Sequence, residues 1–192
     1  MIRRLNIAVF GSGRGSNFNA ILSAIRRGEI PGAKIAVVIS NNSSAGILEI
    51  ARANGIPVEH ISEKRFPDHE QFAAHVLATL CRLDVNFIVL AGYMKRIPQR
   101  MTGEFRNRII NIHPALLPKF GGQGMFGIHV HEAVIAARER FSGATVHVVD
   151  EEYDRGKILL QKKVEVAPED DAETLAGKIL TIEHGLYPEA LK

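Results

Sequence analysis

Two side chains that could take part in acyl transfer lie close together near the middle of the chain. Asn111 and His113 close residues 108–113, which are expected to form a strand, and Pro114 follows directly. Because side chains alternate along a strand, both point to one side, and the proline then takes the chain out of the sheet. An amide can donate a hydrogen bond to the oxyanion of a tetrahedral intermediate, and an imidazole can move a proton near neutral pH. The pair therefore indicates acyl transfer to an amine, with a histidine that bonds only backbone as the alternative.

An acidic turn at residues 151–156 offers a carboxylate for this pair. The turn follows the next expected strand, so its side chains are expected near the same edge of the sheet. Asp154, just before Gly156, is the best placed to approach a ligand, and it could hold the imidazole protonated or orient a water molecule. Glu151 and Glu152 are expected to be solvated charges. The chain has no serine nucleophile elbow and no thiol beside a histidine, so direct attack without a covalent enzyme intermediate is expected.

A glycine-rich loop lies between the first expected strand and the first expected helix. Its residues Gly13, Arg14, Gly15, Ser16 and Asn17 would present free backbone N–H groups at a helix N-terminus, which favours a phosphate. The loop lacks the Lys-Ser/Thr pair of a P-loop, and Ser16 stands where a dinucleotide fingerprint has its third glycine. The next strand ends without the acid that would hold an adenine ribose, so NAD and nucleoside triphosphates are disfavoured. The simpler interpretation is a tight turn in which Ser16 or Asn17 caps the helix.

Alternating apolar and amphipathic segments are expected to position these residues. Strands are expected at residues 5–10, 34–40, 56–60, 87–91, 108–113, 144–149 and 158–166, and helices at residues 18–26, 45–53, 68–82, 129–138 and 171–187. This order predicts a Rossmann-like α/β fold, with an open, mostly parallel twisted sheet, helices on both faces and an antiparallel, hairpin-like addition near the C-terminus. Loops at the carboxyl ends of such strands build ligand sites.

Length and composition fit one globular domain covering residues 1–192. Hydrophobic side chains make up 46% of the chain and charged ones 23%, and the net charge is +3. The basic residues are spread along the chain, so nucleic acid is not the favoured partner, whereas small anionic substrates suit the charge balance.

Several other classes of protein and site are disfavoured. The single cysteine, Cys81, cannot form an internal disulfide, and the first apolar run is too short for a signal peptide. No run approaches the roughly 18 apolar residues of a membrane span, so we expect a cytoplasmic protein with no membrane partner. His129 and His131 could recruit a metal on spacing alone, but side chains at this spacing on a helix point apart, so no metal site is expected.

Three motifs taken together carry a resemblance to a known family. They are Gly13-Arg14-Gly15-Ser16-Asn17, Asn111-Ile112-His113-Pro114-Ala115-Leu116-Leu117-Pro118 and Tyr153-Asp154-Arg155-Gly156. They resemble the phosphoribosylglycinamide formyltransferases, a family of folate-dependent enzymes of purine synthesis, and the likeness runs over essentially the whole chain. The central motif is shared with other folate formyltransferases and formyl hydrolases, so it identifies the chemistry better than the acceptor.

The resemblance implies a set of ligands and site residues. The co-substrate would be 10-formyltetrahydrofolate, the acceptor would be glycinamide ribonucleotide, and no metal would be needed. The implied catalytic residues are Asn111, His113 and Asp154; the ribonucleotide and its phosphate would meet Gly13, Arg14, Gly15, Ser16, Asn17 and Glu183; and folate would meet Tyr93, Met94, Lys95, Arg96, Ile97, Asn111, Val149, Asp150 and Tyr153. The single domain would comprise a phosphate-binding half, residues 1–100, and a catalytic and folate-site half, residues 101–192, in a monomer or a homodimer.

The resemblance also implies a mechanism and leaves alternatives. The amine would attack the formyl carbon while Asn111 and a protonated His113 stabilise the oxyanion, with Asp154 keeping His113 charged. The chain departs from many members in its longer glycine-rich segment, residues 120–127, and in His69, where some members have an arginine for the folate tail. Three alternatives remain: a formyltetrahydrofolate hydrolase, a dinucleotide-dependent oxidoreductase and a non-catalytic nucleotide-binding module.

Overall fold

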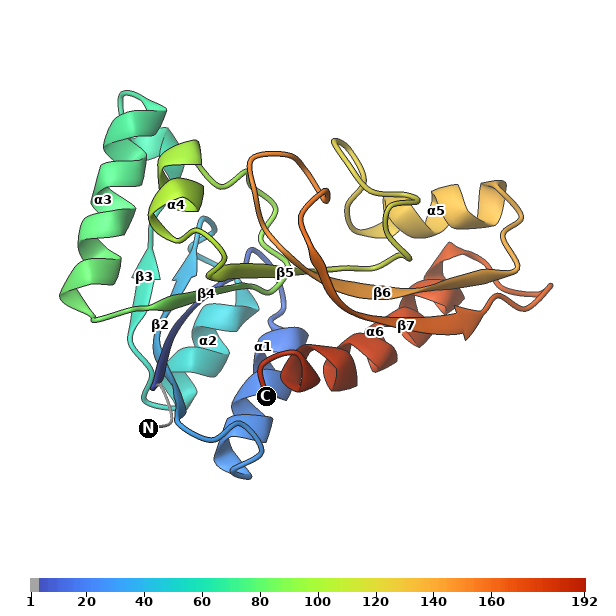
Figure 1. Cartoon of the computed structure of the whole chain (residues 1–192), viewed down its shortest axis with the longest axis horizontal. Coiled ribbons are helices and arrows are strands. Elements are labelled where there is room, and N and C mark those ends of the chain that lie inside the picture. Colours follow the sequence, from blue (N-terminus) through green and yellow to red (C-terminus); the bar gives the residue numbers. More distant parts are fainter. Residues whose placement is uncertain (1–3) are drawn as a thin grey trace. The chain divides into compact units, whose positions relative to one another are not determined.

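The computed structural model of the protein describes residues 4–192 and shows alternating strands and helices (Figure 1). The strands are β1 (Leu5–Phe10), β2 (Ala33–Ser40), β3 (Val58–His60), β4 (Phe87–Leu90), β5 (Ile109–His113), β6 (Phe141–Val148) and β7 (Ile158–Glu165). The helices are α1 (Ser16–Arg26), α2 (Gly46–Ala53), the short 3₁₀-helix η1 (Glu63–Arg65), α3 (His69–Arg82), α4 (Gln99–Glu104), α5 (Ile128–Ala136) and α6 (Ala172–Glu189).

The strand order confirms the predicted fold class. Hydrogen bonds connect the strands in the order β3-β2-β1-β4-β5-β6-β7. β1 pairs in parallel with β2 and with β4, β2 pairs in parallel with β3, and β6 and β7 pair antiparallel. The fold is therefore an open, mostly parallel α/β sheet with an antiparallel pair of strands near the C-terminus. The chain divides into two compact units at β5, one ending at Ile110 and including Lys192, the other spanning Asn111–Leu191.

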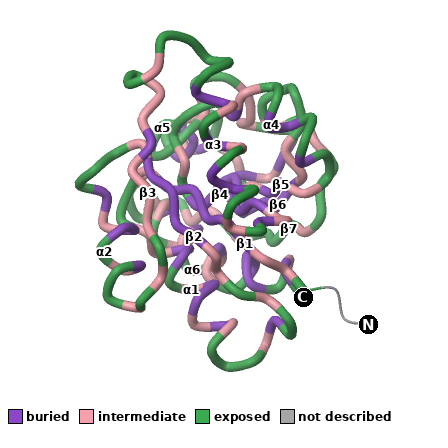
Figure 2. The backbone as a smooth tube through the Cα atoms, turned by 90° about the vertical axis from the view of Figure 1, so that its left-hand side faces the viewer, coloured by how far each residue is buried: buried purple, intermediate pink, exposed green. Residues whose placement is uncertain are grey.

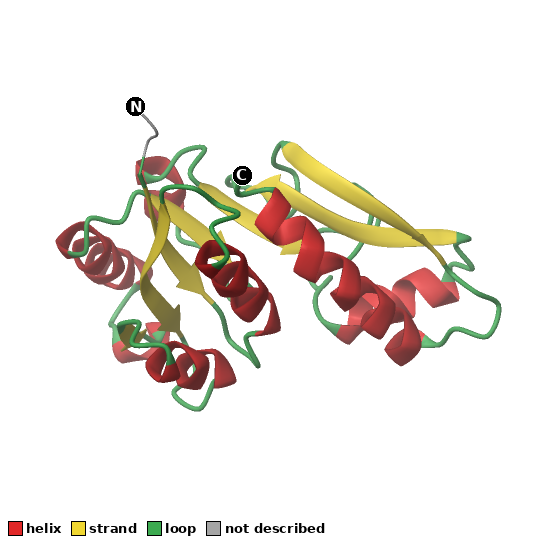
Figure 3. Ribbon diagram, turned by 90° about the horizontal axis from the view of Figure 1, so that it is seen from below, coloured by secondary structure: helices red, strands yellow, loops and turns green. Residues whose placement is uncertain are grey.

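The first unit is a parallel sheet covered by helices on both sides (Figure 3). Ile7, Ala8 and Val9 of β1 are completely buried, and Figure 2 shows long buried stretches along β1, β2 and β4. This burial explains why the strands are mostly apolar rather than alternating. Each fully buried Ile or Val side chain contributes about 1.5–3 kcal/mol relative to an exposed one. Rigid strands thus hold the loops that follow β1, β2 and β4.

The second unit is built around the hairpin of β6 and β7. α6 packs against β6, where Leu175 and Ile179 are buried. Asp171 starts this helix with a capping box, because its side chain accepts from the Thr174 backbone N–H while Thr174 bonds back to the Asp171 N–H. Residues of β6 are mostly buried and those of β7 mostly exposed. β6 is therefore the inner strand on which functional side chains of this unit can be held rigidly.

One helix and several element boundaries differ from those expected from the sequence. α4 was not expected, because its six residues are too few to show a helical period after Pro98. α1 begins at Ser16 rather than at residue 18. β6 begins at Phe141 rather than at residue 144, because Gly143, which interrupts the apolar run, lies within the strand. A Cβ on Gly143 would lie 2.1 Å from the Lys162 carbonyl oxygen, so glycine permits the close pairing of β6 with β7.

Candidate active site

The end of β5 presents the two side chains first identified in the sequence. Asn111 is half-buried and His113 is buried at the start of the second unit, and Pro114 follows as the chain leaves the strand. The loop after His113 is fixed by Thr145 of β6, whose hydroxyl donates to the Ala115 carbonyl oxygen at 2.6 Å. This arrangement places His113 on a rigid strand and a braced loop rather than on a mobile surface segment.

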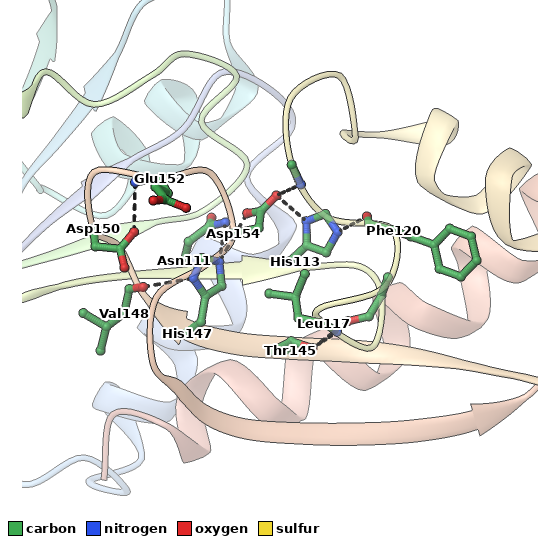
Figure 4. A network of polar contacts seen from close by, with 12 residues as sticks. Asn111, His113, Leu117, Phe120, Thr145, His147, Val148, Asp150, Glu152 and Asp154 are labelled. Atoms are coloured by element: carbon green, nitrogen blue, oxygen red, sulfur yellow. Dashed lines mark hydrogen bonds and ion pairs between the residues drawn. The ribbon is translucent and has the colours of Figure 1, made fainter.

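The His113 ring is held from both of its nitrogens (Figure 4). Its Nε2 lies 2.7 Å from the Phe120 carbonyl oxygen, and its Nδ1 lies 3.6 Å from Asp154 Oδ2. A carbonyl oxygen only accepts, so Nε2 carries a hydrogen and donates it to Phe120. The proton that titrates is therefore the one at Nδ1, the nitrogen that faces the carboxylate.

Asp154 is the residue of the acidic turn that reaches this histidine. Its backbone has φ +55°, in the left-handed region, and its side chain is only 11% exposed. Oδ2 accepts the Gly122 backbone N–H at 2.9 Å, and Oδ1 lies 3.5 Å from His147 Nε2. The sequence prediction that this turn lies near His113 is met, and the carboxylate sits between two imidazoles and a loop amide.

Burial and neighbouring charges act against each other on His113 and Asp154. Burial lowers the pKa of the His113 imidazole below its ordinary 6.5, and the Asp154 charge and the Phe120 carbonyl offset only part of this effect. Burial alone would raise the pKa of the Asp154 carboxyl, but the His147 hydrogen bond, the charge of His113 and the Gly122 N–H together lower it below 3.8. Burial thus opposes protonation of His113, while the ionised Asp154 beside Nδ1 favours it.

His147 belongs to the same cluster and was missed in the sequence. It is buried on β6, its Nδ1 donates to the Val148 carbonyl oxygen at 3.0 Å, and its Nε2 lies 3.2 Å from Asn111 Nδ2. Nε2 faces both Asn111 and Asp154: the neutral ring accepts the Asn111 amide there, whereas the charged ring donates its Nε2–H to the Asp154 carboxylate. A signal existed: Thr145 and His147 are alternate polar residues in an otherwise apolar strand, so they share a face.

The stability of the folded protein should depend on pH through its buried histidines. We expect the free energy of unfolding to fall as the pH is lowered from about 7.5 to about 5.5. Burial lowers the pKa of both His113 and His131 from the ordinary 6.5. The charge of His113 lowers the pKa of His131 further. The unfolded chain then binds more protons as the pH falls through 6.5, so stability present above that pH is lost below it.

Replacement of His131 tests this pH dependence. His131→Leu removes one of the two imidazoles whose pKa is lowered by burial and should reduce the slope of the unfolding free energy by at most about 1.4 kcal/mol per pH unit. Urea denaturation at several pH values measures the slope. The exposed His129, in the same helix, provides the control, and His129→Leu should leave the slope unchanged. An equal slope in His131→Leu and the parent protein would contradict the assignment.

Within the described residues, the glycine loop of the first unit leaves backbone N–H groups free at the start of α1. Gly15, with φ +84°, is the N-cap of α1, and no side chain caps the helix, so the interpretation with Ser16 or Asn17 as the cap is wrong. Among residues 4–192, no group accepts a hydrogen bond from the backbone N–H groups of residues 13–16. A Cβ on Gly15 would lie 2.7 Å from Ile47 Cα, so only glycine permits this close packing on α2. Free N–H groups at a helix N-terminus are the donors that a phosphate needs.

The segment after β4 borders a cavity in the first unit. Tyr93 packs edge-on against Phe10 with ring centroids 5.4 Å apart, and burial together with the Glu63 charge raises the pKa of its hydroxyl to about 12. Met94 is half exposed, Lys95 and Arg96 are exposed, and Ile97 is buried. The cavity has a volume of about 710 Å³ and is lined by Asn41, Ser62, Glu63, Lys64, Phe66, Pro67, Asp68, His69, Tyr93 and Lys95.

The remaining candidate residues lie in the second unit. Glu183 is buried within α6, and Val149 is half-buried. Asp150 is exposed and accepts the Glu152 backbone N–H at 3.0 Å, while Tyr153 is 45% exposed. Asn111, His113, His147 and Asp154 are linked by the contacts described above.

A known protein family and several of its members match this chain over nearly its whole length. The profile of the formyl transferase family matches residues 5–191. The chloroplastic phosphoribosylglycinamide formyltransferase of Vigna unguiculata is 44% identical over 191 residues, covering 100% of this chain and 61% of that protein. Phosphoribosylglycinamide formyltransferase of Haemophilus influenzae is 40% identical over 186 residues, covering 97% of this chain and 85% of that protein.

Solved structures of glycinamide ribonucleotide transformylases also match the chain. The crystal structure of glycinamide ribonucleotide transformylase 1 from Symbiobacterium toebii matches with a TM-score of 0.93 and 38% identity, covering 100% of this chain and 87% of that one. The chain spans only 61% and 65% of the lengths of the Vigna unguiculata and Arabidopsis thaliana relatives. The chain belongs to the formyl transferase family, and the Vigna unguiculata and Haemophilus influenzae relatives described above are phosphoribosylglycinamide formyltransferases.

Proposed function

We propose that the protein transfers the formyl group of 10-formyltetrahydrofolate to the amine of 5-phosphoribosylglycinamide. The products are formylglycinamide ribonucleotide and tetrahydrofolate, in a step of purine biosynthesis. The observation that carries the proposal is the buried cluster in which Asp154 lies 3.6 Å from His113 and 3.5 Å from His147, with Asn111 bonded to His147. The names of the relatives support the same reaction and the same acceptor.

The cluster supplies the groups that amine formylation needs. The amine lone pair attacks the formyl carbon, and the carbonyl electrons move to oxygen, where Asn111 Nδ2 and His113 Nε2–H donate hydrogen bonds. The His113 donor is bonded to the Phe120 carbonyl oxygen, so the loop must release it before it can serve the oxyanion. The attacking amine loses one proton and the folate nitrogen gains one as its bond to carbon breaks, and Asp154 with His113 Nδ1 relays that proton.

The two substrates are assigned to residues outside the cluster of Asn111, His113, His147 and Asp154. We propose that the free N–H groups of residues 13–16 bind the ribonucleotide phosphate, helped by Arg14 and Asn17, and that Glu183 contacts the glycinamide amine. Tyr93, Met94, Lys95, Arg96 and Ile97, together with Val149, Asp150 and Tyr153, would contact the folate. The cavity lined by Tyr93 and Lys95 supports this assignment for the first unit.

One assay tests the proposed reaction. The protein is mixed with 10-formyltetrahydrofolate, and folate absorbance is followed with and without glycinamide ribonucleotide. We expect tetrahydrofolate to form only when the acceptor is present. Release of formate at an equal rate without the acceptor would instead identify a hydrolase that uses the same side chains on water, and no change in either mixture would contradict both.

The location, partners and oligomeric state of the enzyme are also part of the proposal. We expect a cytoplasmic enzyme that acts without nucleic acid, membrane or metal, as a monomer or a homodimer, and size-exclusion chromatography with light scattering distinguishes these two states. Within residues 4–192, no helix has the length and apolar character needed to cross a membrane. The described residues also contain no group of three or more side chains arranged to hold a metal ion.

Substitution of Gly121 should lower activity through Asp154. A Cβ on Gly121 would lie 2.5 Å from Leu117 Cδ2 and 3.0 Å from Asp154 Cβ, so Gly121→Ala must move the end of the Leu117 side chain and shift Asp154 slightly. A misplacement of about 1 Å can cost about 10²-fold in rate, so for this smaller shift we expect kcat to fall by about 10-fold or less in steady-state assays.

A second glycine provides the control for this substitution. Gly103 lies in α4, and a Cβ there would meet nothing within 4 Å. Gly103→Ala should keep the parent kcat and stabilise the protein slightly, because alanine favours a helix over glycine. Equal kcat values for the two variants would show that the contact with Asp154 does not matter.

A further inference from the structure

Ser12 connects three loops at the carboxyl edge of the parallel sheet in the first unit. β1 lies between β2 and β4, so the residue that follows β1 is flanked by the segments that follow both neighbours. The Ser12 hydroxyl donates to Asn41 Oδ1 at 2.5 Å and accepts the Met94 backbone N–H at 2.9 Å. One side chain thus bonds the loop after β2 to the segment after β4.

The Ser12 backbone also bonds to the segment after β4 and to the loop after β2. Its N–H donates to the Gly92 carbonyl oxygen at 3.0 Å, and its carbonyl oxygen lies 3.4 Å from Asn42 Nδ2, which donates to it. Two bonds, one from the backbone and one through the hydroxyl, therefore attach Ser12 to residues 92–94. Ser12 has no donor left for a ligand, since its N–H and its hydroxyl hydrogen are both used within the protein.

The free donors of the glycine loop begin directly after this residue. The N–H groups of residues 13–16 bond to nothing else among residues 4–192, whereas Ser12 is fully engaged. The loop before it is tightly packed, because a Cβ on Gly11 would lie 2.9 Å from the Ala91 carbonyl oxygen. An anion that orders residues 13–16 therefore acts on a chain whose preceding residue is bonded to Met94.

We propose that Ser12 is a positioning residue that couples the two ligand-binding segments of the first unit, so that binding at one raises the affinity of the other. The coupling runs from residues 13–16 through the Ser12 hydroxyl to the backbone of Met94, which sets the path of residues 93–97. This inference rests on the proposed function, because that function assigns the ribonucleotide phosphate to the first segment and the folate to the second. Coupling of this kind is reciprocal, so either ligand can be titrated against the other.

The test uses a pair of ligands that cannot react with each other. Tetrahydrofolate and glycinamide ribonucleotide carry no formyl group between them, so calorimetry can measure tetrahydrofolate affinity with and without saturating ribonucleotide. In the parent protein we expect the ribonucleotide to raise this affinity by about 5-fold or more, within the usual range of coupling between sites. In Ser12→Ala the ratio should fall close to one, and Ser12→Thr, which keeps the hydroxyl, should retain it.

Two further variants separate coupling from simple loss of structure. Asn41→Ala removes the acceptor of the Ser12 hydroxyl and should reduce the ratio; because Asn41 also lines the cavity, its tetrahydrofolate affinity without ribonucleotide is measured as well. Ser44→Ala is the control, because that hydroxyl lies near the same strand ends but bonds only to Asn42 Oδ1, and it should leave the ratio unchanged. A parent ratio of one, or a ratio in Ser12→Ala and Asn41→Ala equal to that of the parent, would overturn the coupling.

The outcome also distinguishes this inference from the proposed function. A parent protein that transfers formyl groups and binds both ligands independently retains the function and loses the coupling. A parent protein that binds neither ligand and transfers no formyl group overturns both.

Discussion

Replacing His113 with alanine should lower kcat by about 100- to 1,000-fold with a small change in KM for either substrate. The substitution removes the Nε2–H donor proposed for the oxyanion, and loss of one such donor costs about 2–4 kcal/mol in the barrier. It also removes Nδ1, the nitrogen 3.6 Å from Asp154 that takes part in proton transfer. Steady-state kinetics with 10-formyltetrahydrofolate and glycinamide ribonucleotide measures the effect.

A second histidine serves as the control for His113→Ala. His129 is exposed at the start of α5, where its Nδ1 lies 3.0 Å from Glu132 Oε2, and His129→Ala should retain the parent kcat. Circular dichroism and thermal unfolding would show that both variants are folded. Turnover by His113→Ala at the parent rate would remove this histidine from the mechanism.

Replacing Asp154 with asparagine should have an effect at least as large. The amide keeps the size of the side chain and can still accept the Gly122 N–H with its oxygen, but it carries no charge. A comparable change of a carboxylate beside a catalytic histidine lowers kcat by about 10⁴-fold in serine proteases, so we expect a loss between about 10²- and 10⁴-fold.

The pH profile of this variant provides an independent measurement. The Asp154 charge raises the pKa of His113 against the effect of burial, so removing the charge lowers that pKa further. The acidic limb of kcat/KM in Asp154→Asn should therefore move to lower pH than in the parent protein. Glu152→Gln, in the exposed part of the same turn, is the control and should change neither the rate nor the profile. An unchanged acidic limb in Asp154→Asn would separate the carboxylate from the titration of His113.

The fold was largely predictable because its signals are local. Mostly apolar runs such as β1 and β2 are typical of buried parallel strands, and each is followed by an amphipathic helix. α4 was not predicted, because a six-residue helix is too short to show a helical period of apolar residues. The boundary of β6 was wrong because the intrinsic preference of Gly143 is against a strand, whereas its packing against β7 requires glycine.

The candidate site was predictable only in part. The spacing of Asn111 and His113 fixed their common side of β5, and the order of strands predicted that the acidic turn would lie near them. The contribution of His147 was not predicted, because its importance depends on the pairing of its Nε2 with Asn111 and Asp154 rather than on any local motif. The charge state of His113 was also beyond the sequence, since it results from a balance between burial and a carboxylate that only coordinates can give.

The backbone at position 154 limits which residues the turn can accept. Its φ of +55° is a conformation that glycine, asparagine and aspartate adopt far more readily than other residues. A saturation library at this position should therefore yield well-expressed proteins chiefly with Gly, Asn or Asp, of which only the last turns over at the parent rate. The two slow variants could be used to trap both unreacted substrates together in a crystal.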